Sequence, residues 1–225
     1  MRHALVLAAG RGERMRPLTD ATPKPLLDVG GKPLIVHHIE KLAAAGVRDI
    51  VINTSHLAEQ FPAALGDGST WGVTLRYSYE GATPLETGGG MLRALPLLGD
   101  APFIVVSADI WSDMDYAGLP GEPEGIAHLV MVPNPDFHPA GDFSLADGRL
   151  YDDGAPAGAE RLTFGNVGVY RPQIVAGESP GAFKLLPMYR RAMAQGRLTG
   201  ELFHGFWRNV GTPAQLDEVR GAIRG

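Results

Sequence analysis

The sequence predicts an α/β protein with a mixed, mainly parallel sheet covered by helices, in one domain over residues 1–225. Apolar runs that end in turn residues alternate with segments of helical periodicity, which is typical of parallel strands joined by crossover helices. A length of 225 residues also suits one large domain that buries its core without disulfides.

The first half of the chain predicts four strands separated by three helices. We expect strands at residues 4–9, 49–54, 73–79 and 103–108, the first beginning almost at Met1. The run 4–9 is short and is interrupted by Gly10, which favours a buried strand over a signal peptide. Helices are expected from Pro33 to a stop at Gly46, over 57–65 and over 90–98, where Pro96 can kink or end the last one.

Glycine, proline and aspartate become frequent between residues 121 and 158, so the parallel pattern weakens there. We expect strands at 126–132, 167–170 and 203–210, a hairpin turn at 146–148 and a helix at 183–195. Residues 212–215, with the sequence TPAQ, have the form of a capping box with proline at the first helical position. They predict a last helix that runs through Ile223.

Composition excludes several classes of function. The chain has no cysteine, which excludes disulfides, thiolate metal sites and cysteine nucleophiles and fits a cytoplasmic protein. The net charge of -5 argues against a nucleic-acid binder, since a phosphate backbone requires a basic surface. No apolar run approaches the ~20 residues of a membrane-spanning helix, so we expect no membrane contact.

A glycine-rich turn follows the first predicted strand, in the run LAAGRGERMRPLT (7–19) continued by TPKPL (22–26). Small residues in such a turn let backbone N–H groups approach a polyphosphate closely. No third glycine stands at Met15 and no GxxxxGK[ST] occurs, so the dinucleotide fingerprint and the P-loop are excluded. Basic residues outnumber acidic ones around this turn. They are Arg11, Arg14, Arg16, Lys24 and Lys32, against Glu13, Asp20 and Asp28.

Asp109 directly follows the predicted strand 103–108. In open α/β sheets, a carboxylate at the carboxyl end of a strand points into the crevice that binds ligands. Mg²⁺ prefers oxygen ligands and usually takes only one or two from the protein. Asp109 is therefore the leading candidate for a Mg²⁺ ligand.

The run 7–26 resembles the GxGxRMxPLTxxxPKPL signature of the sugar-nucleotide pyrophosphorylase family. The similarity extends to ETGGG (86–90), VVSAD (105–109) and WRNVGTP (207–213). It implies a Rossmann-like nucleotidyltransferase fold of the GT-A type. It also implies Mg²⁺-dependent transfer of a nucleotidyl group from a nucleoside triphosphate to a sugar 1-phosphate, with release of pyrophosphate.

The resemblance assigns roles to individual residues. It places Arg14 on the outer phosphates, Lys24 on the reacting phosphates and Asp109 on Mg²⁺, and these three are the expected catalytic residues. Further nucleotide contacts are expected from Ala8, Gly10, Gly12, Glu13, Ser107, Glu80 and Gly88, the last two near the base. Sugar contacts are expected from Asp142, Gly165 and Asn166. Ala108 stands where glycine is common, and Asn209 stands where the family usually presents a second aspartate to Mg²⁺, while Thr87 has the alternative role of a helix cap.

The choice of substrate is indicated by three further runs, EGATPLETGGG (80–90), GDFSL (141–145) and GAFKL (181–185). They most resemble members that join UTP to N-acetylmuramate 1-phosphate in bacterial peptidoglycan recycling. Without the β-helix that bifunctional members append, no acetyltransferase activity is expected. Two alternatives stay open: a mannose- or heptose-1-phosphate guanylyltransferase, and a non-catalytic regulatory protein that binds nucleotides, which Asn209 would allow.

Overall fold

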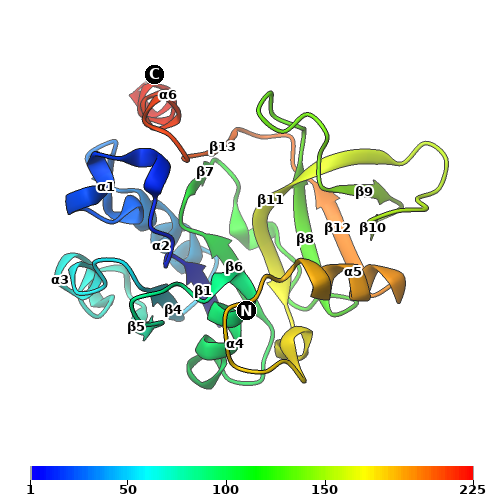
Figure 1. Cartoon of the computed structure of the whole chain (residues 1–225), viewed down its shortest axis with the longest axis horizontal. Helices are drawn as coiled ribbons and strands as arrows, with labels where there is room; N and C mark the ends of the chain where they lie inside the picture. The colour runs from blue at the N-terminus through cyan, green and yellow to red at the C-terminus, as the bar shows by residue number, and fades with distance from the viewer. Residues whose placement is uncertain (1, 225) are drawn as a thin grey trace.

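A computed structural model describes residues 2–224, which form a nine-stranded mixed sheet with helices on both faces (Figure 1). The strand order is β5-β4-β1-β6-β11-β8-β12-β10-β9. The strands are β1 His3–Leu7, β4 Asp49–Thr54, β5 Thr74–Tyr79, β6 Phe103–Ser107, β8 Ala127–Val132, β9 Phe143–Ala146, β10 Arg149–Tyr151, β11 Glu160–Tyr170 and β12 Leu198–Leu202. Two small pairs join β2 (Asp28–Val29) to β3 (Lys32–Pro33) and β7 (Ile110–Ser112) to β13 (Trp207–Asn209).

Strand direction differs between the two halves of the large sheet. β5, β4, β1 and β6 are mutually parallel, and their positions follow the prediction closely. Beyond β6 the β8–β12 pair is parallel, whereas β11, β10 and β9 pair antiparallel with their neighbours. A mainly parallel sheet is therefore correct for the first half and wrong for the second. β1 begins at His3, close to the predicted start near Met1, and Met1 itself lies outside the described residues.

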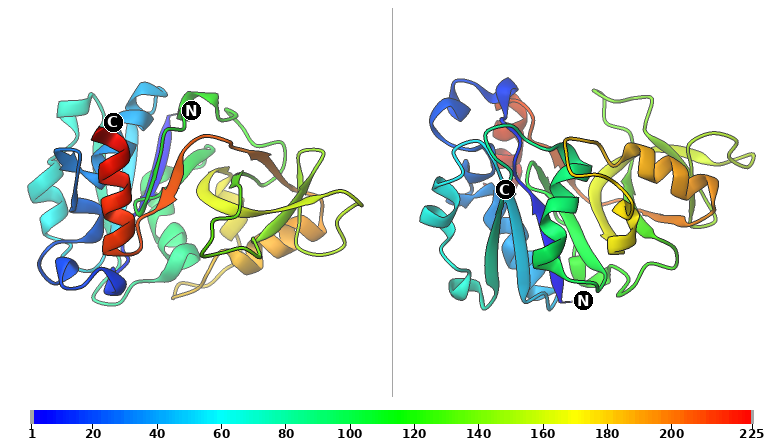
Figure 2. Two further views of the ribbon diagram at one scale, coloured as in Figure 1. Left: turned by 90° about the horizontal axis from the view of Figure 1, so that it is seen from above. Right: turned by 60° about the horizontal axis from the view of Figure 1, so that its bottom comes forward.

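The helices are α1 Leu18–Ala21, α2 Leu34–Ala44, α3 Gln60–Leu65, α4 Glu86–Leu98, α5 Leu186–Ala194 and α6 Pro213–Arg224. Residues of α2 and α3 share one core with Ala4 and Val6, whereas α4 and α5 share another with Leu5. Successive side chains of a strand point to opposite faces, so β1 is buried on both sides. Two views of the ribbon show this layering (Figure 2).

The C-terminal segment returns to the first half of the chain, where α6 lies beside the N-terminal elements (Figure 1). Leu216 and Val219 pack with Val29 in a small third core. At the start of α6, Thr212 Oγ1 accepts a hydrogen bond from Gln215 N at 3.3 Å. Gln215 Oε1 accepts one from Gly211 N at 2.9 Å, so the capping box forms with its return bond one residue early.

The prediction of one strand over 203–210 is wrong. Two strands, β12 and β13, end and begin in this region, and they belong to different sheets. Gly205 lies between them, at a site where a Cβ would come within 2.2 Å of Phe203 Cζ and 2.5 Å of Asp113 Oδ1. This crowded corner interrupts the strand. The sequence did not predict β12 because it contains Gly200 and Glu201, residue types that strands disfavour.

Three predicted helices have different starts. α3 begins at Gln60 instead of residue 57, because Leu57 has a positive φ of 50°. α5 begins at Leu186 instead of residue 183, and α4 begins at Glu86 instead of residue 90. The last two differences have one cause: the Phe183 carbonyl accepts hydrogen bonds from two glycine N–H groups in the first turn of α4. Pro96 lies inside α4 without ending it.

The hairpin turn at residues 146–148 is confirmed. Asp147 and Gly148 join β9 to β10 with φ values of 48° and 73°, the left-handed pair that a type I′ turn requires. No helix among residues 2–224 is long and apolar enough to cross a membrane.

Candidate active site

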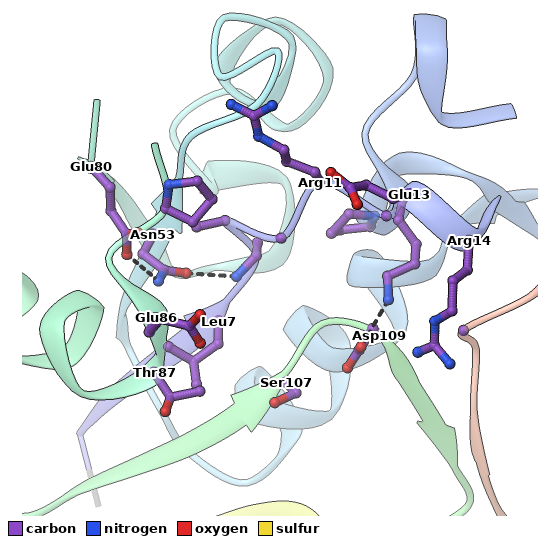
Figure 3. A pocket seen from close by; sticks show the side chains of 18 residues that line it. Leu7, Arg11, Glu13, Arg14, Asn53, Glu80, Glu86, Thr87, Ser107 and Asp109 are labelled. Atoms are coloured by element: carbon purple, nitrogen blue, oxygen red, sulfur yellow. Dashed lines mark hydrogen bonds and ion pairs between the residues drawn. The ribbon is translucent and has the colours of Figure 1, made fainter. Parts of the chain in front are cut away.

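A cavity of about 640 Å³ opens at the carboxyl ends of β1, β4 and β6 (Figure 3). Its walls are the glycine-rich turn after β1, the ends of the neighbouring strands, and the segment between β5 and the first turn of α4. Nine residues predicted for the site line it: Ala8, Gly10, Gly12, Glu13, Arg14, Lys24, Glu80, Ser107 and Asp109. Residues far apart in the sequence thus meet where open α/β sheets bind ligands.

The glycine-rich turn is held in a compact shape by its own contacts. Gly12 has a φ of 63°, and a Cβ there would lie 2.9 Å from Thr19 Cγ2. Its carbonyl accepts hydrogen bonds from Thr19 Oγ1 and Met15 N, both at 2.8 Å. Met15 is fully buried and anchors the turn. A positive φ together with this crowding requires glycine at position 12.

Lys24 and Asp109 form an ion pair at the floor of the cavity (Figure 3). Lys24 Nζ lies 2.8 Å from Asp109 Oδ2, and the two side chains are 11% and 36% exposed. The lysine charge is therefore almost removed from solvent, whereas the carboxylate faces the cavity. A cation held in this way is placed to meet an entering anion with little loss of side-chain freedom.

Arg14 brings a second positive charge to the cavity. Its side chain is exposed, and within the described residues it forms neither an ion pair nor a hydrogen bond. The guanidinium lies over Gly211, where a Cβ would approach Arg14 Nη2 to 3.0 Å. Gly211 thus packs against the Arg14 guanidinium, and the N–H donors of Arg14 stay available for an anion.

The backbones of Asp109 and Asn209 are neighbours, because β7 begins directly after Asp109 and pairs with β13, which ends at Asn209. Asn209 is paired with Ile110, and Val210 N donates to the Asp109 carbonyl at 2.7 Å. Asn209 Oδ1 is buried and has no hydrogen-bond partner among the described residues. A buried oxygen without a partner is costly unless something fills it, and a hard cation coordinates such oxygens.

Asp109 and Asn209 each bring an oxygen of the kind that Mg²⁺ prefers. In the part of the chain that the structure describes, no group of three or more His, Cys, Asp or Glu side chains could hold a metal ion by itself. A cation here would thus take few charges from the protein and the rest from phosphate oxygens.

The opposite wall contains a buried polar pair, Glu80 and Asn53. Glu80 is 7% exposed, and this burial raises the pKa of its carboxyl group above the usual value. Asn53 was missed from the sequence, although an amide inside the apolar strand DIVINT is a signal that could have found it. Thr87 lines the cavity, and its Oγ1 accepts from Leu185 N at 3.0 Å instead of capping α4.

Five predicted residues lie outside the lining of this cavity: Asn209, which is described above, and the four that follow. Gly88 N donates to the Phe183 carbonyl at 2.8 Å, so its N–H is already satisfied. Asp142 Oδ2 accepts from Phe164 N at 2.8 Å, and the carbonyl of Gly165 accepts from Trp207 Nε1 at 2.9 Å. Asn166 has a φ of 59° in the irregular part of β11. The last three are thus brought together around β11.

Comparison with known proteins identifies relatives along the whole chain. Residues 3–120 match the model of the nucleotidyl transferase family. N-acetylmuramate alpha-1-phosphate uridylyltransferase of Neisseria meningitidis is 49% identical over 224 residues, 96% of each chain. The protein of the same name from Caulobacter vibrioides is 39% identical over 93% of this chain and 92% of its own. Mannose-1-phosphate guanylyltransferase of Mycobacterium tuberculosis is 39% identical over 52% of this chain and 32% of its own.

Solved structures agree on the fold. HddC from Yersinia pseudotuberculosis superposes with a TM-score of 0.78 at 19% identity, covering 99% of this chain and 100% of its own. A Bacillus anthracis protein assigned as a glucose-1-phosphate thymidylyltransferase superposes with a TM-score of 0.82 at 20% identity, covering 100% and 96%. The mixed α/β domain is therefore of the type found in sugar nucleotidyltransferases.

Proposed function

Because this chain belongs to the nucleotidyl transferase family, we propose that it joins UTP to N-acetylmuramate α-1-phosphate and releases pyrophosphate. The enzyme class and family predicted from the sequence are confirmed by the comparisons. The observation that carries the substrate proposal is the 49% identity over 96% of both chains to a relative of that name. The guanylyltransferase alternative has less support, since the similarity to mannose-1-phosphate guanylyltransferase spans about half of this chain.

The proposed chemistry is an in-line displacement at the α-phosphorus of the nucleotide. A phosphate oxygen of the sugar phosphate forms the new P–O bond, and the bond between the α-phosphorus and the bridging oxygen to the β-phosphate breaks. The electron pair leaves with pyrophosphate. The attacking phosphate monoester is already anionic near neutral pH, so the chain needs no general base.

The protein's task is then to align two anions that repel each other. Lys24 supplies a charge fixed by Asp109 at the cavity floor, and Arg14 supplies one from the rim. Both would neutralise charge that develops on the transferred phosphoryl group. The compact turn at Gly10 and Gly12 leaves room for phosphate oxygens beside the backbone.

Asp109 and Asn209 would hold Mg²⁺, whose positive charge supplies Lewis-acid stabilisation of phosphate oxygens when it is bound. The buried Oδ1 of Asn209 without a partner supports this assignment. Ala8, Glu13 and Ser107 remain our proposed nucleotide contacts, and Asp142, Gly165 and Asn166 our proposed sugar contacts. Both carboxylate oxygens of Glu80 and the N–H of Gly88 are bonded within the protein, so we propose that these two residues support the cavity wall instead of contacting the base. A role in peptidoglycan recycling in the cytoplasm follows from these substrates.

Pyrophosphate release measured with four substrate pairs tests the proposal. UTP or GTP is combined with N-acetylmuramate 1-phosphate or mannose 1-phosphate in the presence of Mg²⁺, and kcat/KM is compared. We expect UTP with N-acetylmuramate 1-phosphate to be preferred, and Asp109→Asn to be inactive in the same assay. Preference for GTP with mannose 1-phosphate would establish a guanylyltransferase. Nucleotide binding without turnover on any pair would instead establish a regulatory protein.

A further inference from the structure

Asn53 is the second-last residue of β4, lines the cavity and is 2% exposed. Its Oδ1 accepts a hydrogen bond from Ala8 N at 2.6 Å, and its Nδ2 donates to Glu80 Oε1 at 2.6 Å (Figure 3). Glu80 Oε2 in turn accepts from Leu85 N at 2.7 Å. One buried chain of hydrogen bonds thus runs from the glycine-rich turn after β1, which we call the phosphate turn, to Leu85, the residue that precedes α4.

These hydrogen bonds allow only one orientation of the Asn53 amide. Backbone N–H groups donate at both ends, so the side chains between them must accept there. One amide and one carboxylate meet both requirements and still bond to each other, whereas two amides or two ionised carboxylates do not. The two walls of the cavity are therefore set at a separation that this pair determines.

Helix α4 closes the remaining space around the pair. A Cβ at Gly90 would lie 2.3 Å from Glu80 Oε1 and 2.7 Å from Asn53 Nδ2. The pair therefore packs against α4 at a position where only glycine leaves room for it. A buried polar pair that is fully bonded and sterically confined is rigid, as binding sites require of the residues that support them.

We propose that Asn53 is a positioning residue for the nucleotide: it holds the phosphate turn and the 80–87 segment at the spacing that a bound nucleoside triphosphate requires. Asn53 acts through Ala8 N and Glu80 and donates nothing to the reacting atoms. This inference rests on the proposed function, because it assumes that the cavity takes a nucleoside triphosphate.

Exchanging donor and acceptor within the pair tests the inference. Asn53→Asp sets two carboxyl groups against each other, and they must share one proton to stay bonded. We expect the Kd for Mg–UTP to rise at least tenfold at pH 8 and to recover as the pH is lowered. The double variant Asn53→Asp with Glu80→Gln restores every bond with the polarity reversed. Its new amide at position 80 donates to the new carboxylate at position 53 and accepts from Leu85 N.

The double variant should therefore bind Mg–UTP within about threefold of the parent, without the pH dependence of the single variant. Glu80→Gln alone leaves one amide facing two donors, so it should weaken binding at all pH values. Binding is measured by titration calorimetry, turnover by pyrophosphate release, and folding by thermal unfolding of each variant.

These readouts separate the two hypotheses. A parent that binds Mg–UTP without turnover would refute the proposed function, and the binding series would still test Asn53. The inference on Asn53 is overturned if the double variant binds no better than Asn53→Asp. It is also overturned if binding by Asn53→Asp falls only in proportion to the unfolded fraction, which is the result expected of a merely structural residue.

Discussion

Lys24 Nζ lies 2.8 Å from Asp109 Oδ2, so a lysine whose side chain is only 11% exposed is held by the carboxylate that we assign to the metal. One Asp109 oxygen is thereby occupied, and the carboxylate remains 36% exposed toward the cavity. The same contact aligns a positive charge with the strand end where ligands enter. The proposed phosphate contact of Lys24 and the proposed metal contact of Asp109 therefore depend on one ion pair.

Replacing Lys24 by alanine should remove turnover with little effect on folding. A charge-assisted contact made in the transition state contributes on the order of 2–4 kcal/mol, so kcat should fall roughly 30- to 1,000-fold. The Asp109 carboxylate left behind is partly solvated, which limits the loss of stability. Steady-state kinetics and thermal unfolding measure the two effects, and full activity would refute the assignment of Lys24.

Arg14 and Arg16 form a matched pair for testing the role of charge. Arg14 lines the cavity, whereas Arg16 pairs with Asp20 at 3.2 Å on an exposed face of the same segment. Arg14→Ala should reduce kcat/KM for UTP roughly 30- to 1,000-fold. Arg16→Ala should leave it nearly unchanged, since exposed pairs contribute little. Equal losses in the two variants would indicate a general electrostatic effect instead of a phosphate contact.

The sequence predicted the parallel half of the fold well, because its strands are continuous apolar runs that end in turns. The start of α4 escaped prediction because three consecutive glycines, 88–90, argue against a helix. In the structure they suit one, since a Cβ at Gly88 would meet the Phe183 ring at 2.4 Å and one at Gly89 the Gly181 carbonyl oxygen at 2.1 Å. The start of α5 was predicted too early because the Phe183 carbonyl bonds to α4. Such demands come from distant segments that local propensity does not register.

Some residues of the site could likewise be predicted from the sequence and others could not. Lys24 and Asp109 were predicted because a motif and a strand end mark them, and the structure brings them together. Asn53 was not, because its role depends on two partners, Ala8 and Glu80, that are distant in sequence. Asp142, Gly165 and Asn166 lie on the less regular half of the sheet, where sequence patterns are weak, and their roles stay predictions.

His38 should make the protein sensitive to mild acid. It is fully buried, its Nε2 bonds the Ile110 carbonyl and its Nδ1 bonds Tyr116 Oη, both at 2.8 Å. This burial lowers the pKa of His38 from 6.5 to about 4. Between these values the unfolded state binds a proton that the folded state does not. Stability is therefore complete above pH 6.5 and falls as the pH approaches 4, by on the order of 3 kcal/mol from this group.

Urea unfolding between pH 7 and pH 4.5 measures this dependence. His38→Gln retains one donor and one acceptor and should show a shallower pH slope than the parent. His204→Gln, on an exposed side chain, is the control and should keep the parent slope. Burial also lowers the pKa values of His37 and His128, so part of the slope persists in every variant. A slope unaltered by His38→Gln would contradict the prediction.

Gly90→Ala should weaken nucleotide binding although it favours the helix. Alanine stabilises a helix interior over glycine by about 1 kcal/mol, but here the methyl group would displace the Glu80 carboxyl and the Asn53 amide. Gly221 in α6 has no atom within 4 Å of its Cβ position, so Gly221→Ala should show the helix gain alone. Chemical unfolding and Mg–UTP titration compare the two variants, and similar behaviour would show that the cavity wall tolerates the displacement.

Asn209 should determine how strongly the enzyme depends on free Mg²⁺. Its Oδ1 is buried without a partner among the described residues and its backbone lies beside Asp109, but an amide oxygen brings no negative charge to the metal. We expect Asn209→Asp to lower the Mg²⁺ concentration for half-maximal activity, because a second carboxylate strengthens the site. Asp109→Asn should nearly abolish turnover at any practical Mg²⁺ concentration.

Initial rates over a Mg²⁺ titration compare the parent with both variants. Direct Mg²⁺ titration without nucleotide is a second readout: the parent should bind weakly, because phosphate oxygens supply most of the negative charge, and Asn209→Asp should bind more tightly. Thermal unfolding of each variant checks that the β7–β13 pair stays intact. Superimposable Mg²⁺ curves for the parent and Asn209→Asp would remove Asn209 from the metal site and leave its buried oxygen to another role.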